Sequence, residues 1–378
     1  MDTAYLTSSE FWKSDTCHVM VNDRDPAAVA QSEIIRSWCQ DNDQFREHLL
    51  FSTSGSTGDG KWVTLSRSAL LASAHAVNEH LQVTENDHWL LALPTFHVGG
   101  MGIIARAHLA SCKLSLYQES WNVTQFHKAL GNEITLTSLV PTQLTDLVDA
   151  HLTAPECLCA VLIGGGALSD DVYQQAIELG WPVIETYGMT EASSQIATAS
   201  ILDRKLKVLP CWQTRTDADG LLSIKGEPLL SAYLKVENGK VTRESPLTNG
   251  WFTTSDRVKV ENDHLVFKGR SDRCAKVLGE LVDLAGVESG LKKMLGRDQV
   301  AVVAVPDQRK GSRLVAFIEG TRETHSVDQA LAEYNRVCSP VARVESILMV
   351  NAFPRTALGK LRYAKLVERF HDDETLAE

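Results

Sequence analysis

Short apolar runs alternate with longer amphipathic stretches over residues 48–198. The strand-like runs lie at 48–53, 88–94, 113–118, 134–141, 159–163 and from 182 onward. Between them, apolar residues recur every three or four positions at 67–81, about 100–110, 142–152 and 170–180, which is typical of helices that pack on a sheet. The alternation predicts an α/β fold, and in open α/β sheets ligands collect at the carboxyl ends of the strands.

The pattern changes after about residue 210, where short segments separated by Asn-Asp and Asn-Gly turns indicate antiparallel strands. A second change follows residue 270, with a helix predicted over 279–295 and then a strand, a strand and a helix. We therefore predict that residues 1–270 form a large domain of layered α/β sheets with an antiparallel β subdomain at about 210–270. Residues 271–378 are predicted to form a small α+β domain.

The composition limits the classes of partner. With 44% hydrophobic and 22% charged residues, the 378-residue chain resembles ordinary globular proteins. Its formal net charge is −11 and its Lys and Arg residues are not clustered, which argues against nucleic acid as a partner. No apolar run approaches the roughly 20 residues that span a bilayer, and the first residues lack the apolar core of a signal peptide. We expect a cytoplasmic protein with no membrane span.

The cysteines and histidines do not form a metal-binding pattern. The eight cysteines are scattered, and the closest pair, Cys157 and Cys159, is too tightly spaced for a usual zinc site. We expect free, mostly buried thiols. The twelve histidines show no HExxH spacing. Magnesium, bound through carboxylates and phosphates, stays open.

A loop of glycines and small hydroxyls, TSGSTGDGK at 53–61, follows the first strand-like run. Gly55 to Lys61 fits the GxxxxGK pattern of P-loop nucleotide hydrolases, but Trp62 stands where that motif needs Ser or Thr, and KWVTLS alternates like a strand. The P-loop interpretation is therefore disfavoured. Glycines still let the backbone approach a triphosphate closely while hydroxyls and Lys61 donate hydrogen bonds, although a plain surface loop is the alternative.

Five motifs occur in an order that resembles the adenylate-forming superfamily, which includes acyl-CoA synthetases, peptide-synthetase adenylation domains and luciferases. They are TSGSTGDGK at 53–61, FHVGG at 96–100, TYGMTE at 186–191, TSD at 254–256 with GRSD at 269–272, and PRTALGKLR at 354–362. The resemblance implies an ATP-dependent acid–thiol ligase that forms an acyl-adenylate and then an acyl-CoA thioester. It implies ATP, Mg²⁺ and coenzyme A as cofactors, and a small domain that swivels between two catalytic poses.

The resemblance also assigns catalytic roles by position. Thr190 is implied on the phosphate side, Glu191 on magnesium, and His97 beside the acid. Lys360 matches the lysine that reaches the carboxylate and the α-phosphate. Attack of one anion on another needs positive charge in the transition state, which Lys360 and magnesium would provide.

The nucleotide cradle implied by the resemblance is larger. Asp256 and Arg270 are its ribose contacts, although Ser255 replaces the usual glycine, and Asp272 falls at the pivot of the small domain. Lys276 lies in the loop that would face the site after rotation, where Cys274 and Ala275 depart from the commoner pattern. The full set is Thr53, Ser54, Gly55, Ser56, Thr57, Gly58, Lys61, Gly164, Gly165, Gly166, Tyr187, Gly188, Met189, Asp256, Arg270 and Lys276.

Two segments, LIGGGALS and ETYGMTEASSQIAT, most resemble those of ligases that act on o-succinylbenzoate. The resemblance implies an aryl acid with a second carboxylate, held by polar groups of the acyl pocket. The residues implied there are His97, Gly100, Gly165, Ser194 and Gln195. Simple loop packing is the alternative for these segments.

Other functions stay open at this point. The chain could adenylate an aryl or fatty acid and load it on a carrier protein, or it could bind acyl-adenylate without catalysis. Only 52 residues precede Thr53, fewer than in most members of the family, so we expect most of an N-terminal subdomain to be missing. A partner subunit, including a second copy in a homo-oligomer, could cover the surface this leaves.

Overall fold

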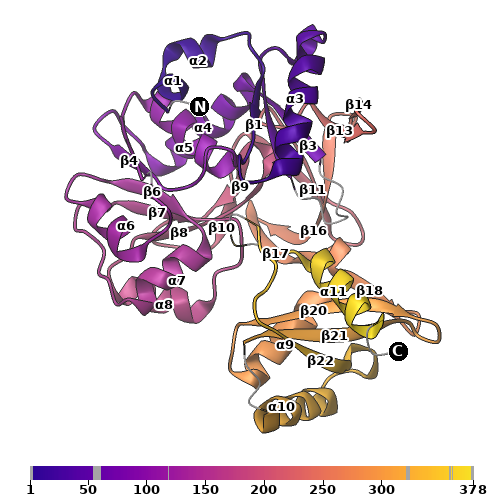
Figure 1. The fold of residues 1–378 in the computed structure, drawn as a ribbon. Helices are drawn as coiled ribbons and strands as arrows, with labels where there is room; N and C mark the ends of the chain where they lie inside the picture. The colour runs from indigo at the N-terminus through magenta and orange to yellow at the C-terminus, as the bar shows by residue number, and fades with distance from the viewer. Residues whose placement is uncertain are drawn as a thin grey trace.

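The computed structural model describes residues 3–53, 61–117, 119–320, 324–356, 359 and 361–375. They form a large unit that ends with β17 (His264–Arg270) and a smaller unit that carries the last three helices (Figure 1). This arrangement confirms the predicted fold class, in which a large α/β domain precedes a small one. The helices also show that, over the described residues, none has both the length and the apolar composition needed to cross a bilayer.

Five parallel strands form the centre of the large unit, in the order β5-β4-β6-β7-β8. They are β4 (His88–Leu91), β5 (Lys113–Leu116), β6 (Leu136–Leu139), β7 (Ala160–Ile163) and β8 (Val183–Met189). Successive strand residues point to opposite faces, so Trp89 packs with one hydrophobic cluster and Leu90 with another. One face is covered by α4 (Arg67–Leu81) and α5 (Val98–Ala110), and the other by α6 (Val123–Leu130), α7 (Pro141–Asp149) and α8 (Asp170–Glu178).

Beyond β8 the same sheet becomes antiparallel, in the order β9-β10-β17-β16-β12-β11, with β15 paired to β16. The strands are β9 (Ser194–Thr198), β10 (Leu206–Val208), β11 (Trp212–Thr216), β12 (Leu221–Gly226), β15 (Leu247–Thr248) and β16 (Trp251–Glu261). Positive φ angles at Asn249, Gly250, Asn262 and Asp263 confirm the predicted turns. The antiparallel strands expected after about residue 210 are present, and antiparallel pairing already begins earlier, at β9.

A second sheet has the order β1-β2-β3-β13-β14. Its strands are β1 (His18–Met20), β2 (His48–Thr53), β3 (Lys61–Ser66), β13 (Ala232–Glu237) and β14 (Lys240–Glu244). Strands β2 and β3 form a hairpin in which Thr53 pairs with Lys61. Since Lys61 begins a strand and the next helix starts at Arg67, the P-loop interpretation is wrong.

The first 47 residues contain structure that the sequence pattern left undescribed. They form α1 (Thr3–Thr7), α2 (Ser9–Lys13), α3 (Pro26–Gln40) and η1 (Asp43–Phe45). Helix α3 has clear start signals, because Asp25 caps it and Pro26 is its first residue. The helix packs Ile35 and Cys39 against the five-stranded sheet.

The smaller unit is built on a three-stranded sheet of β20 (Val300–Asp307), β21 (Gly311–Glu319) and β22 (Val344–Val350). The predicted helix, strand, strand, helix order is confirmed by α9 (Leu284–Leu295), β20, β21 and α10 (Thr324–Val337). The sequence pattern missed β22, η4 (Pro340–Ala342), α11 (Tyr363–Thr375) and the hairpin of β18 (Cys274–Val277) and β19 (Glu280–Asp283). Two hydrophobic clusters of the small unit contain only residues from 275 onward, so this unit has its own core.

All eight cysteines lie in described segments and are free, as predicted. The expectation that most are buried is wrong: Cys39 is buried, Cys159 is exposed and the other six are half-buried.

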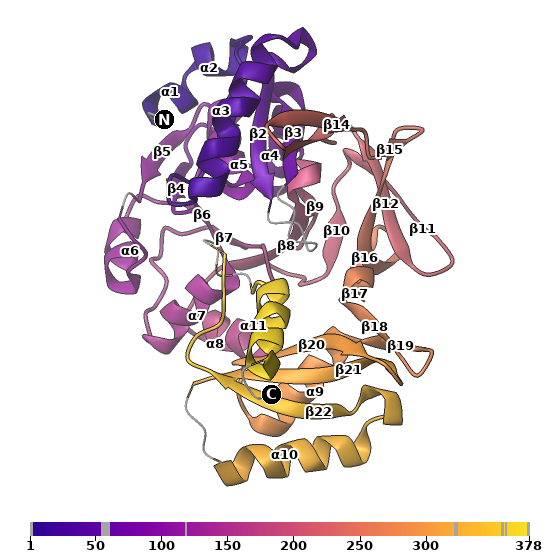
Figure 2. The same cartoon turned by 45° about the vertical axis from the view of Figure 1, so that its right-hand side comes forward.

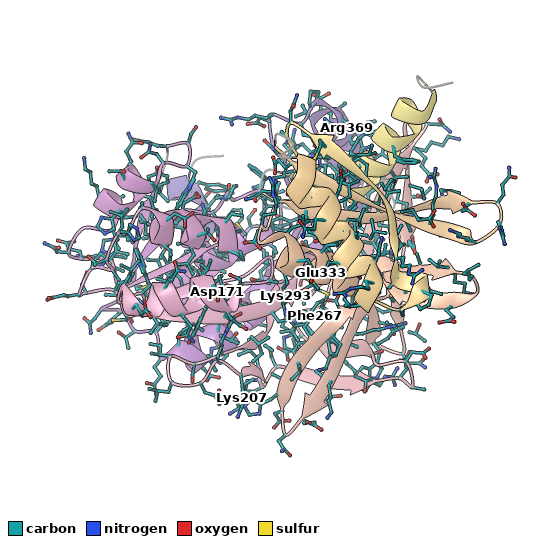
Figure 3. The ribbon with its side chains drawn as sticks, turned by 90° about the horizontal axis from the view of Figure 1, so that it is seen from below. Asp171, Lys207, Phe267, Lys293, Glu333 and Arg369 are labelled. Carbon is teal, nitrogen blue, oxygen red and sulfur yellow. The ribbon has the colours of Figure 1, made fainter. Side chains whose placement is uncertain are left out.

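Seen from below, Lys293 of α9 and Glu333 of α10 lie on the small unit, with Asp171 of α8 on the neighbouring part of the large unit (Figure 3).

Candidate active site

The strand β8 is the centre of the candidate site, because the sheet changes there from parallel to antiparallel pairing. Backbone packs closely on both sides of it. A Cβ on Gly164 would lie 2.5 Å from the Thr186 hydroxyl, and a Cβ on Gly188 would lie 1.6 Å from the Ser194 carbonyl oxygen. Glycine is therefore required at Gly188, where the contact is with backbone, whereas a Cβ on Gly164 would have to displace the Thr186 side chain. Gly165, with φ +84°, and Gly166 are exposed beside it.

A network of four side chains lies where the large unit ends. The Tyr187 hydroxyl donates a 2.6 Å hydrogen bond to Oδ2 of Asp256, a residue that is only 5% exposed. Oδ1 of Asp256 accepts from Arg270 at 2.9 Å, and Arg270 also binds Asp272 through two bonds of 2.8 and 2.6 Å. The structure thus brings three predicted cradle residues and the predicted pivot together.

Charge in this network fixes its donors and acceptors. Burial, followed by the charge of Asp256, raises the pKa of the Tyr187 phenol, so it stays protonated. The hydrogen bonds that Arg270 donates to Asp272 are the main cause that raises the pKa of Arg270 above its usual value. Asp256 is therefore an acceptor surrounded by two donors.

A second cluster lies where β8 ends. Glu191 belongs to η2 (Thr190–Ala192), directly after that strand, and Thr190 is half-buried beside it. Oε1 of Glu191 accepts a 2.9 Å hydrogen bond from Tyr233 of β13. The ammonium of Lys61 lies 4.7 Å from the centre of the Tyr233 ring. Among the described residues, nothing else binds the Glu191 carboxylate.

Tyr233 is a member of this cluster that the motif comparison missed. It is 7% exposed, and burial together with the nearby Glu191 carboxylate raises the pKa of its phenol. Its hydroxyl is thus a permanent donor to Glu191. Strand alternation in SAYLKV could have placed it on an inward face, but it could not have shown which partner it meets.

The predicted phosphate loop is only partly described. Thr53 ends β2 and its hydroxyl donates to the Lys61 carbonyl oxygen at 3.3 Å. Ser54, Gly55, Ser56, Thr57, Gly58 and Lys360 lie outside the described residues. Lys61 is the last residue of the loop and also a member of the Glu191 cluster, and Thr53 at the other end pairs with Lys61. The loop therefore begins and ends beside that cluster.

Four of the five predicted acyl-pocket residues lie at the start of α5 and on β9, and Gly165 lies in the loop after β7. His97 precedes α5 with its ring 4.7 Å from that of Phe96. A Cβ on Gly100 would lie 2.3 Å from the Pro94 carbonyl oxygen, so the helix start packs closely on the β4 loop. Ser194 begins β9, whereas the side chain of Gln195 is buried and accepts a 2.6 Å hydrogen bond from Thr198.

A buried cation near Ser194 was also missed by the sequence pattern. Arg106 of α5 is only 2% exposed, and its Nη2 lies 3.2 Å from where a Cβ on Gly102 would stand. The same Cβ would lie 3.7 Å from the Ser194 Cβ. The only signal was an arginine inside a helix that is otherwise apolar.

The guanidinium of Arg106 has no anionic partner among the residues that the structure describes. It lies 5.6 Å from the Trp89 ring centre, and burial lowers its pKa to about 10. Two buried donors at this contact have no hydrogen-bond partner in the described chain: Arg106 Nε and Nε1 of Trp89, the ring that the guanidinium faces. Such a set of unpaired donors around a buried positive charge fits an anion.

The described residues of the segment at 351–362, which leave out 357, 358 and 360, are here called the strap, and they rise from β22 toward β7 (Figure 2). A Cβ on Gly359 would lie 3.5 Å from the Thr142 hydroxyl, and a Cβ on Gly166 would lie 3.6 Å from Pro141. Residue 359 of the small unit therefore reaches the start of α7, beside the glycine loop. Lys276 lies elsewhere, exposed on β18.

Two family matches cover most of the chain. Residues 13–245 match the AMP-binding enzyme family and residues 286–360 match the AMP-binding enzyme C-terminal domain. The 2-succinylbenzoate–CoA ligase of Enterococcus faecalis is 30% identical over 82% of this chain and 67% of its own length. The "Probable 2-succinylbenzoate–CoA ligase" of Mycobacterium tuberculosis is 32% identical over 92% of both chains.

Solved structures give the same result. The o-succinylbenzoate CoA synthetase (MenE) of Bacillus subtilis, in complex with the acyl-adenylate intermediate OSB-AMP, has a TM-score of 0.73 at 25% identity, covering 84% of this chain and 68% of that one. The same enzyme in complex with ATP and magnesium ion has a TM-score of 0.72 at 25% identity, covering 84% and 69%.

Proposed function

The chain belongs to the AMP-binding enzyme family, and from this premise we propose that it is an AMP-forming ligase that joins 2-succinylbenzoate to coenzyme A. ATP activates the acid, and CoA takes the acyl group from the adenylate. With ATP and CoA as co-substrates, we expect the enzyme to work in the cytoplasm.

In the first half-reaction, a carboxylate oxygen of the acid attacks the α-phosphorus of ATP. A new O–P bond forms while the bond to the β-phosphate breaks, and pyrophosphate leaves. We assign the ribose hydroxyls to Asp256, whose Arg270 and Tyr187 hydrogen bonds hold its carboxylate in place. The phosphates are assigned to the loop between Thr53 and Lys61 and to Thr190.

Glu191 is our candidate for the metal ligand. A single carboxylate oriented by the Tyr233 hydroxyl offers the hard oxygen that magnesium prefers. When bound, magnesium supplies positive charge beside the phosphates. The family role of Lys360 in neutralising the same transition state is supported by the position of Gly359 over Thr142, which places the strap beside the glycine loop.

In the second half-reaction, the thiol of CoA attacks the acyl carbonyl carbon. The C–S bond forms, the thiol loses its proton, and the C–O bond breaks so that AMP leaves. We propose that the unit from 271 to 378 then presents Lys276 and its hairpin to the site.

One observation carries the substrate assignment: the buried, unpaired guanidinium of Arg106. 2-Succinylbenzoate has two carboxylates, of which one is adenylated and the other stays anionic. A free carboxylate that bonds to Arg106 beside the Trp89 ring would satisfy the two unpartnered donors, Arg106 Nε and Trp89 Nε1. An acid with one carboxylate would leave the buried charge unpaired.

The test is acid-dependent exchange of labelled pyrophosphate into ATP, followed by CoA-dependent thioester formation. We expect both reactions with 2-succinylbenzoate and much slower exchange with benzoate and with a fatty acid. A phosphopantetheinyl carrier protein, offered in place of CoA, should stay unloaded. Absence of turnover with 2-succinylbenzoate would refute the substrate assignment.

A further inference from the structure

A buried carboxylate of the small unit, Glu288 of α9, takes no part in the site described above. The residue is 8% exposed. Oε2 accepts hydrogen bonds of 3.0 Å from Nη2 of Arg273 and from the backbone N–H of Val302, and Oε1 pairs with Lys292 at 3.1 Å. A carboxylate in such a position is held rigidly, because every donor comes from a different part of the unit.

Tyr363 completes the network. Its hydroxyl lies 3.2 and 3.1 Å from the two oxygens of Glu288, and the guanidinium carbon of Arg273 lies 3.4 Å from the centre of its ring. Burial, then the charge of Glu288, raises the pKa of the Tyr363 phenol to about 12, so it remains a donor. Arg273 also donates to the Val302 carbonyl oxygen at 3.0 Å.

The two outer members of the network occupy special places in the chain. Arg273 ends η3 (Ser271–Arg273), the segment by which the chain crosses between the two units. Ser271, in the same segment, donates to the Ser255 carbonyl oxygen of the large unit at 3.0 Å. Tyr363 begins α11 directly after the strap, three residues beyond position 360. Glu288 therefore joins the crossing segment to the strap.

The other end of the strap is held by a second carboxylate. Glu319 accepts from the Phe353 N–H at 3.0 Å and pairs with Arg355 at 3.3 Å, while Arg355 donates to the Gly359 carbonyl oxygen at 3.0 Å. The strap is thus fixed at both ends, and only the Glu288 end is connected to the crossing segment.

We propose that Glu288 is a positioning residue for the adenylation half-reaction, because it locks the strap that carries Lys360 to the crossing segment next to the ribose-binding cluster. The proposal rests on the function proposed above. Through this network, Tyr363, which follows the strap, is held to Arg273 of the crossing segment. The second half-reaction needs no charge on Lys360, so it is not expected to depend on Glu288.

The two half-reactions are measured separately in variants of the full chain. Pyrophosphate release from ATP and the acid reports adenylation, and thioester formation from synthetic acyl-adenylate and CoA reports the second step. For Glu288→Gln we expect adenylation kcat to fall about tenfold or more, since small misplacements of a catalytic group are costly, while KM for ATP and the second step stay within about twofold. Tyr363→Phe removes one hydroxyl and should lower adenylation kcat a few-fold.

Two comparisons and one fallback make the result decisive. The double variant should be no slower than Glu288→Gln, because both changes break one network. Glu345→Gln, which breaks the ion pair of Glu345 with Lys310 in the same unit, should leave the ratio of the two rates unchanged. If Glu288→Gln does not fold, Tyr363→Phe carries the test alone.

An equal loss in both half-reactions would mean a structural role only and would overturn the proposal, as would normal adenylation in both variants. Pyrophosphate exchange in the unaltered protein is measured first. If the unaltered protein shows exchange and the variants adenylate at the same rate, only the role of Glu288 is refuted. If the unaltered protein shows no exchange with any acid, the proposed function is refuted as well.

Discussion

Replacing Arg106 by Met is expected to make the protein more stable and less active. In the part of the chain that the structure describes, the buried guanidinium has no anionic partner, and burial lowers its pKa from the usual arginine value to about 10. A difference of this size corresponds to about 3 kcal/mol of destabilisation at neutral pH, since one pKa unit is about 1.4 kcal/mol. Losing the contact with the Trp89 ring costs about 1 kcal/mol of stability, so the net gain in the free energy of unfolding is about 2 kcal/mol.

The sign of the pH dependence follows from the same shift. The unfolded chain binds the Arg106 proton more tightly than the folded one, so folding is penalised at all pH values below about 10. The penalty disappears as pH rises from about 10 to 12.5. Arg106→Met should therefore raise Tm by a few degrees near pH 7, with a smaller gain in alkaline buffer.

Activity should move in the opposite direction. Removing one partner of a buried ion pair between enzyme and substrate costs about 2 to 5 kcal/mol, which lowers kcat/KM for 2-succinylbenzoate by roughly 30-fold to several thousand-fold. For benzoate, which lacks the second carboxylate, the change should be small. Differential scanning calorimetry and pyrophosphate exchange measure the two effects on one preparation.

Arg67→Met is the matched control. Arg67 is also buried, at 3% exposed, but it donates 2.8 Å hydrogen bonds to the carbonyl oxygens of Phe11 and Thr16. Its loss leaves those acceptors unsatisfied, so Tm should fall. A lower Tm for Arg106→Met as well, or equal losses of activity with both acids, would refute the reasoning that Arg106 awaits an anion.

Three further outcomes are expected. Tyr233→Phe leaves Glu191 without its donor, so the magnesium concentration for half-maximal exchange should rise about fivefold, as titration of the metal would reveal; an unchanged midpoint argues against Glu191 as the ligand. Asp256→Ala leaves Tyr187 and Arg270 without their acceptor and should raise KM for ATP by about tenfold or more, measured by exchange at varied ATP. Lys360→Ala should abolish adenylation while preformed adenylate still reacts with CoA; survival of both half-reactions contradicts its assigned role.

The elements with strong periodicity were predictable. Residues 67–81 were expected to be a helix and α4 has those bounds, because capping by Ser66 and a regular apolar face act locally. The Asn-Gly and Asn-Asp turns were equally clear, since few residue pairs accept two positive φ angles. Helix α3 was not predicted, although the sequence marks its start with Asp25 as the cap and Pro26 as the first residue.

Other features could not be read from local pattern. Tyr233 meets Glu191 across 42 positions of chain, and Arg106 lies near Ser194 only because α5 packs beside β9. Strand β19 was absorbed into the helix predicted over 279–295, because GELVDL has no alternation that separates it from α9. Long-range contacts decided the first two cases, and no periodicity encodes them.

The five-stranded sheet takes its last two strands from far along the chain, because β3 pairs with β13 about 170 residues later. During synthesis at roughly 5 to 20 residues per second, the β2–β3 hairpin leaves the ribosome on the order of ten to thirty seconds before its neighbour exists. For that time, the apolar residues of β3 border a bare hydrogen-bonding edge. Nascent chains of this protein should therefore depend on chaperones during translation.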